Sequence, residues 1–295
     1  MSHSALVIDP RWEPQTVRED VVVDAGRVAA LSALFDDSNP APLPGDELPP
    51  LWHWVALPQW CSSSALSSDG HPRRGRFLPP IDLPRRMFAG GEIELHAALT
   101  VGRVIRRESW VDGVEEKTGR SGSLVIVRVT THLYNDHSDL AVVERQNLIF
   151  REAASQTSGG SDPADAAISP PTPSPLRRTG EWEWEFKTDP SLLMRFSAAT
   201  ANAHRIHYDW PYATRAEGYP GLVVHGPLVT LALAEIVRLE TPDAGVHRVR
   251  HRNVAPLFCG QSAQLKRLAS DSTSVALSAT GDDGRDRATV DIELR

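Results

Sequence analysis

The chain has 295 residues, a formal net charge of −7 and two cysteines, Cys61 and Cys259. With 41% hydrophobic and 23% charged residues it has the composition of a globular protein, and its acidic balance argues against a nucleic-acid binder. No apolar run approaches the roughly 20 residues that span a bilayer, and the N-terminus lacks the basic and apolar regions of a signal peptide. We therefore predict a cytoplasmic protein with no membrane or nucleic-acid partner and no metal.

The first half of the sequence predicts one helix followed by antiparallel strands. Apolar residues at helical spacing between 21 and 37 follow Asp24, whose side chain can cap a helix N-terminus. Strand-like runs follow at residues 92–99, 103–112, 123–135 and 140–150. Glycines separate several of these runs, as expected for the turns of an antiparallel sheet.

A segment with almost no large apolar residues then divides the chain. Residues 155–180 are rich in Ser, Pro, Gly, Thr and Asp and cannot bury enough surface to offset the entropy lost on ordering. We predict that this segment is a linker. It would join an N-terminal domain, residues 1–154, to a C-terminal domain, residues 181–295.

The second half repeats the order of elements. Residues 181–186 alternate Glu with Trp or Phe, the pattern of a half-buried strand, and 226–240 is an apolar helix expected to be buried on most sides. Further strand-like runs lie at 246–258, 261–269, 273–280 and 286–294. A hairpin turn is expected at 282–284. A helix followed by four antiparallel strands, twice over, predicts an α+β fold with a sheet wrapped around a helix in each half.

The segment before the apolar helix holds residues suited to acid–base chemistry. It reads TANAHRIHYDWPYA from Thr200, and His225 and Gly226 come directly before the helix. His207 is a candidate base because an imidazole titrates near neutral pH. Gly226 is a candidate donor to a developing oxyanion, because a helix N-terminus presents unpaired N–H groups.

Five arginines lie among prolines and glycines between residues 71 and 91. They are Arg73, Arg74, Arg76, Arg85 and Arg86. A solvated loop is one interpretation of this stretch. The other is a binding site for a phosphate-bearing ligand, since arginine pairs strongly with phosphate and carboxylate groups.

These motifs resemble those of a known family. Residues 202–213 with 222–228 resemble the hydratase motif of the MaoC-like (R)-specific enoyl-CoA hydratases. Residues 70–91 are similar to the N-terminal region of the type-2 hydroxyacyl-thioester dehydratases, a group that includes mesaconyl-type (3-methylfumaryl-CoA) hydratases. The resemblance implies a double hot-dog fold in a single chain, with a non-catalytic first half and a catalytic second half.

The resemblance also implies roles for individual residues. The family places an Asp five residues before its catalytic His, and Asn202 holds that position relative to His207. His204 and Arg205 stand where the family usually has Asn and Pro. We expect His207 to transfer protons, Asn202 to orient a water molecule and Gly226 to bind the thioester oxygen. The residues expected to bind the acyl-CoA are His204, Arg205, His225, Arg73, Arg74, Arg85 and Arg86.

Competing interpretations remain for the motif residues. His207 can be a structural histidine, and Asn202 can serve only in an Asx turn. A metal bound by His204, His207 and His225 would lack a carboxylate or Cys ligand at a familiar spacing.

We therefore predict a hydro-lyase that adds water to, or removes it from, an enoyl-CoA thioester. The resemblance suggests a short branched dicarboxylic acyl group of the mesaconyl or itaconyl type, no cofactor besides the CoA of the substrate, and a monomer or homodimer. The alternatives are a fatty-acid-type 3-hydroxyacyl dehydratase acting on acyl-carrier-protein or CoA substrates, a thioesterase, and a non-catalytic acyl-thioester-binding protein. The absence of a carboxylate at position 202 argues against a thioesterase.

Overall fold

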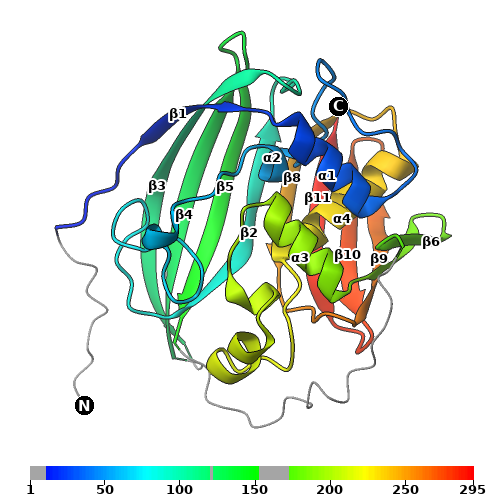
Figure 1. Cartoon of the computed structure of the whole chain (residues 1–295). Helices are drawn as coiled ribbons and strands as arrows, with labels where there is room; N and C mark the ends of the chain where they lie inside the picture. Colours follow the sequence, from blue (N-terminus) through cyan, green and yellow to red (C-terminus); the bar gives the residue numbers. More distant parts are fainter. Residues whose placement is uncertain (1–10, 120–121, 153–172) are drawn as a thin grey trace.

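The computed structural model describes residues 11–119, 122–152 and 173–295, and within them eleven antiparallel strands form one continuous sheet (Figure 1). The strand order across the sheet is β1-β3-β4-β5-β2-β8-β11-β10-β9-β7-β6. The strands are β1 Val17–Val22, β2 Arg85–Leu95, β3 Val104–Gly119, β4 Gly122–Tyr134, β5 Leu140–Arg151, β6 Leu176–Gly180, β7 Glu183–Lys187, β8 Val246–Asn253, β9 Ser262–Ser270, β10 Ser274–Gly281 and β11 Asp286–Leu294. The helices are α1 Ala25–Phe35, α2 His53–Ala56, α3 Pro190–Ala199 and α4 Gly226–Glu240, with short helical turns η1 Ser63–Ala65, η3 Arg205–His207 and η4 Tyr212–Ala216.

The two halves of the chain join where β2 pairs with β8. Their antiparallel register runs from Gly90 opposite Arg252 to Glu94 opposite Arg248. Gly90 has a φ of +146°, and a Cβ on it would lie 2.3 Å from the carbonyl oxygen of His251. Only glycine therefore allows the two strands to approach at this point.

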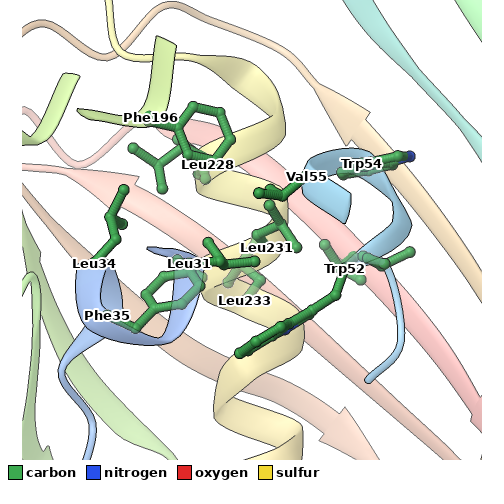
Figure 2. Close-up of a cluster of buried hydrophobic side chains, with 14 of the residues drawn as sticks. Leu31, Leu34, Phe35, Trp52, Trp54, Val55, Phe196, Leu228, Leu231 and Leu233 are labelled. Atoms are coloured by element: carbon green, nitrogen blue, oxygen red, sulfur yellow. The ribbon is translucent and has the colours of Figure 1, made fainter. Parts of the chain in front are cut away.

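Helix α4 forms the centre of the main hydrophobic core. It packs against β10 and β11 of the second half and against β2. Its other side is covered by α1 and α2, as Figure 2 shows for Leu31, Phe35 and Trp52 around Leu231 and Leu233. The helix is thus buried on most sides, as predicted, and this burial fixes the position of its N-terminus. Among the described residues, no helix is long and apolar enough to cross a membrane.

Helix α1 begins after Asp24, whose carboxylate accepts a hydrogen bond from the backbone N–H of Arg27, as the sequence predicted. It packs against α2 and α3 and contributes to the core around α4. The inner face of β3, β4 and β5 instead contacts the loop before β2, where Ile81 and Leu83 join a second, smaller hydrophobic cluster. Helix α1 therefore does not cover the inner face of β3, β4 and β5, and the loop before β2 covers only part of it.

The predicted linker is wrong at its C-terminal end. Residues 176–180 form strand β6, which pairs with β7 and buries Leu176. Residues 155–172 of the predicted linker lie outside the described part of the chain. The predicted alternation in the following strand is confirmed, since Trp184 and Phe186 are buried in β7.

Truncation of Leu231 to Ala should lower the free energy of unfolding by about 2–5 kcal/mol, because this fully enclosed side chain would leave a cavity. The matched control is Leu268→Ala on β9, where the leucine is 61% exposed, and it should change stability by no more than about 0.5 kcal/mol. Urea unfolding followed by circular dichroism measures both variants. Equal losses for the two would contradict the assignment of α4 to the core.

Candidate active site

A cavity of about 560 Å³ lies between the two halves of the chain. The second half contributes Asn202, His204, His207 and Gly226 to its walls. The first half contributes residues from α2, from the loop before β2 and from β2, β3, β4 and β5. These include His53, His71, Arg86, Ser109, Glu144 and Gln146. The sequence-predicted motif therefore faces side chains from the half that was expected to be non-catalytic.

A hydrogen bond to the backbone fixes the ring of His207 and leaves one ring nitrogen free. Its Nδ1 lies 2.7 Å from the carbonyl oxygen of Val223, to which it donates as Nδ1–H, so Nε2 is the nitrogen left to accept a proton. The ring stacks on that of His225 at a centroid distance of 3.6 Å. His225 in turn has its Nε2 2.9 Å from the hydroxyl of Ser197 on α3. Burial lowers the pKa of His207 to about 4, so the imidazole is neutral at physiological pH.

Asn202 and His204 line the cavity next to His207. The side-chain oxygen of Asn202 accepts a hydrogen bond of 3.0 Å from the backbone N–H of His204. This Asx turn is the alternative role considered for Asn202, and it is compatible with a role in the cavity because the amide NH₂ remains. His204 is 4% exposed and its Nε2 has no hydrogen-bond partner among the described residues. Burial, followed by the nearby His71 and His207, lowers its pKa.

Gly226 begins α4 and lines the cavity. Its N–H makes no hydrogen bond to another described residue, and Pro227 beside it has no N–H to offer. A Cβ at this position would lie 3.1 Å from the side-chain nitrogen of Asn253, which also lines the cavity. The site thus combines a free imidazole nitrogen with a free amide donor at the positive end of a buried helix.

A second group of ionisable residues combines His204 of the second half with two residues of the first half. Asp69, His71 and His204 have nitrogen and oxygen atoms within 4.8 Å of one another, the residue types of a metal site. Arg86 lies beside them, lines the cavity and has no ion-pair partner among the described residues. Burial lowers the pKa of Arg86 only to about 10, so it stays positively charged and opposes a bound cation.

Several residues expected to bind the acyl-CoA are engaged elsewhere. Of the four arginines predicted to bind the acyl-CoA besides Arg205, only Arg86 lines the cavity, which Arg107 and Arg287 also border. Arg74 donates to the carbonyl oxygens of Ile81 and Leu83 at 2.6 Å each, and so holds the loop before β2 in place. Arg85 pairs with Glu217 at 3.1 Å.

The remaining residues that were predicted to bind the acyl-CoA also interact with other groups of the protein. Arg73 donates to a backbone carbonyl of its own loop. Arg205 pairs with Asp209 and donates to the carbonyl oxygen of Ser68. His225 is fully buried behind His207 and does not line the cavity, so its contact with the substrate is indirect. Loops with few main-chain partners need such side chains to satisfy their carbonyl groups.

Sequence reasoning missed a polar network on the first-half wall. Glu144 accepts hydrogen bonds of 2.6 Å from both Trp54 and Gln146, and its other oxygen lies 3.2 Å from His53. All four residues line the cavity. A signal was present in the strand run 140–150, where Glu and Gln occupy positions of the same face as buried apolar residues.

Comparison with known proteins agrees with these features. The family model for hydroxyacyl-thioester dehydratase type 2 matches residues 51–259. The chain is 41% identical over 287 residues to mesaconyl-C(4)-CoA hydratase of Chloroflexus aurantiacus, with 96% of each chain covered. It is 25% identical to the mitochondrial hydroxyacyl-thioester dehydratase type 2 of Schizosaccharomyces pombe, over 83% of each chain. A Mycobacterium tuberculosis protein with a double hotdog fold superposes with a TM-score of 0.56 at 17% identity, over 97% of each chain.

The architecture is a double hot-dog, as predicted, and the protein is a hydro-lyase of the enoyl-CoA hydratase and hydroxyacyl-thioester dehydratase class. The chain belongs to the hydroxyacyl-thioester dehydratase type 2 family.

The lowered pKa of His207 predicts the acid limb of the pH profile. A general base works in its neutral form, so activity is present above its pKa and is lost as the pH falls through about 4. We expect kcat/KM to stay level from pH 7.5 to about 5, with the fold checked by circular dichroism at each pH. A loss of about fivefold between pH 6.5 and 5.5, as for an unperturbed imidazole, would contradict the assignment.

Proposed function

We propose that the protein adds water reversibly to a short, branched, dicarboxylic enoyl-CoA thioester of the mesaconyl type, with His207 and Gly226 as its central catalytic groups. The observation that carries the proposal is the free Nε2 of His207 in the same cavity as the free N–H of Gly226. The near full-length identity to mesaconyl-C(4)-CoA hydratase supports the acyl group.

The mechanism follows from the groups available. His207 accepts a proton from water as the water oxygen bonds to the β-carbon, and the electron pair of the double bond moves towards the thioester oxygen. The Gly226 N–H donates a hydrogen bond to that oxygen as its negative charge develops. The imidazolium then returns the proton to the α-carbon, and the thioester carbonyl re-forms. The steps require no cofactor.

The residues that line the cavity support the proposal that the substrate has a polar acyl group. Glu144, Gln146, Ser109 and His53 lie on the first-half wall beside Met87, Phe88, Leu133 and Leu148, so a long alkyl chain that filled the cavity would place hydrocarbon against some charged and hydrogen-bonding groups. Arg86 offers an unpaired positive charge for the free carboxylate of a dicarboxylic acyl group. These features favour the short dicarboxylic substrate over the fatty-acid type.

The proposal includes a cytoplasmic location, in keeping with two free cysteines among the described residues. The proposal also includes an assembly that is a monomer or a homodimer.

Replacing His207 by Ala should lower kcat for mesaconyl-C4-CoA by about 10²–10⁴-fold, because the water loses its base. Loss of the enoyl-thioester absorbance measures the rate. The surface variant His137→Ala, with a 78% exposed side chain, is the control and should keep full activity. An unchanged rate in His207→Ala would refute the proposed mechanism, and a wild type that binds the thioester without turnover would favour the non-catalytic alternative.

Replacing Arg86 by Met should raise KM for mesaconyl-C4-CoA at least about tenfold, because the acyl carboxylate loses its charged partner. KM for crotonyl-CoA, which has no second carboxylate, should change little. Equal effects on both substrates would indicate that Arg86 binds the CoA moiety or supports the fold instead. Preference of the wild type for a long-chain 3-hydroxyacyl thioester would favour the fatty-acid alternative.

A further inference from the structure

The loop that precedes β2 brings a histidine and a carboxylate of the first half to the catalytic motif. A Cβ on Gly70 would lie 1.8 Å from the carbonyl oxygen of Ala203, so the two backbones are in close contact at this glycine. The backbone N–H of Arg205 also donates to the carbonyl oxygen of Asp69 at 2.9 Å. The position of the loop is therefore set by the motif itself.

Within this loop, Asp69 and His71 are arranged as a carboxylate–imidazole pair. Nδ1 of His71 lies 3.4 Å from Oδ2 of Asp69, an ion-pair distance at which the geometry does not make a hydrogen bond. The other carboxylate oxygen of Asp69 accepts hydrogen bonds from the Ser67 hydroxyl and from the backbone N–H of His71, which fixes its orientation. The His71 ring lines the cavity, and its Nδ1 edge faces the carboxylate, so Nε2 is the nitrogen available to a ligand.

The imidazole of His71 is close to the motif histidines. Its ring centroid lies 4.2 Å from that of His204, and the His204 ring lies 5.4 Å from that of His207. The charged and titratable groups that face His71 are Asp69, Arg74, Arg86, His204 and His207. Arg74 lies 4.0 Å from the carboxylate of Asp69, and the charge of Arg86 acts on the same group from a longer distance.

The protonation states fit an acceptor role for His71. Burial and, next, the charge of Arg86 lower the pKa of His71 to about 4, so its ring is neutral near pH 7. Burial raises the pKa of Asp69, but its contacts with His71 and Ser67 outweigh this and keep the carboxyl ionised. The negative charge of Asp69 on the Nδ1 side of the ring favours electron density at Nε2 and so makes Nε2 a stronger hydrogen-bond acceptor.

We propose that His71, oriented and polarised by Asp69, is a second catalytic residue that accepts a hydrogen bond from the attacking water. It would thereby replace the carboxylate that the family motif has at the position of Asn202. The inference rests on the proposed hydration reaction. One hydrogen of the water points to Nε2 of His71 and stays on oxygen, and the other is the proton that His207 takes and returns to the α-carbon. The first half of the chain is then part of the catalytic machinery.

The variant His71→Ala tests this role. The loop should keep its structure, because the hydrogen bonds that His71 makes to Asp69 and Ser67 through its backbone remain in the variant. We expect kcat for mesaconyl-C4-CoA to fall at least about 10²-fold with KM changed less than about threefold. Asp69→Asn should lower kcat less, because the oxygen acceptor stays and only the charge is lost. His137→Ala again serves as the control.

The decisive experiment adds a second change to His71→Ala, which places an Asp at position 202, where the family motif has its carboxylate. If His71 takes the role of the missing carboxylate, the double variant His71→Ala/Asn202→Asp should have a kcat at least about tenfold higher than that of His71→Ala. Added imidazole should also restore activity to His71→Ala and not to His137→Ala. A kcat for His71→Ala within threefold of wild type, or a loss that neither the carboxylate nor imidazole restores, would overturn the inference.

Two outcomes separate this inference from its alternatives. Wild-type protein that does not hydrate mesaconyl-C4-CoA or crotonyl-CoA would refute the proposed function itself. A stoichiometric metal in the purified protein, with activity lost on chelation and regained with the metal, would assign Asp69, His71 and His204 to a metal site and overturn the role of His71 as a water acceptor.

Discussion

The enclosure of α4 is the constraint on which the site depends. The helix is apolar on nearly all sides, so it is stable only with the sheet on one face and other helices on the opposite face. This enclosure places the N-terminus of α4 at the wall of the cavity, where the N–H of Gly226 is free. Because the surrounding core is well packed, the amide donor is rigid, as stabilisation of a developing negative charge requires.

The first half of the chain completes the site. Its sheet joins that of the second half through β2 and β8, and its own helix α1 packs with the helices around α4. The space left above β3, β4 and β5 becomes part of the cavity, and both polar side chains, such as Ser109 and Glu144, and apolar ones, such as Leu133, line it. The same half supplies Arg86 and His71, so its contribution to the site is chemical as well as structural.

Much of the fold could be predicted from periodicity and capping. The α4 pattern, the Asp24 cap and the alternation in β7 are local signals, and each is found in the structure. The limits of the linker were less predictable, because strand β6 is stabilised by pairing with β7 and not by its own composition.

The site was predictable only in part. His207 and Gly226 lie in one short segment and share a recognisable motif. The sequence could not predict that Arg86 lines the cavity whereas Arg74 and Arg85 bind other groups of the protein. Neighbouring arginines differ only in which carbonyl or carboxylate the folded loop brings near them. His71 and Asp69 come close to His204 only through tertiary contacts between distant loops, for which the sequence offers no periodic signal.

The most direct test of the account is a crystal structure with a saturated, unreactive thioester such as 2-methylsuccinyl-CoA. We predict that its thioester oxygen lies within about 3.1 Å of the amide nitrogen of residue 226, with the β-carbon turned towards the ring of residue 207 across the width of one water molecule. A thioester bound away from the start of α4, or one whose oxygen points to the polar wall around Glu144, would contradict it.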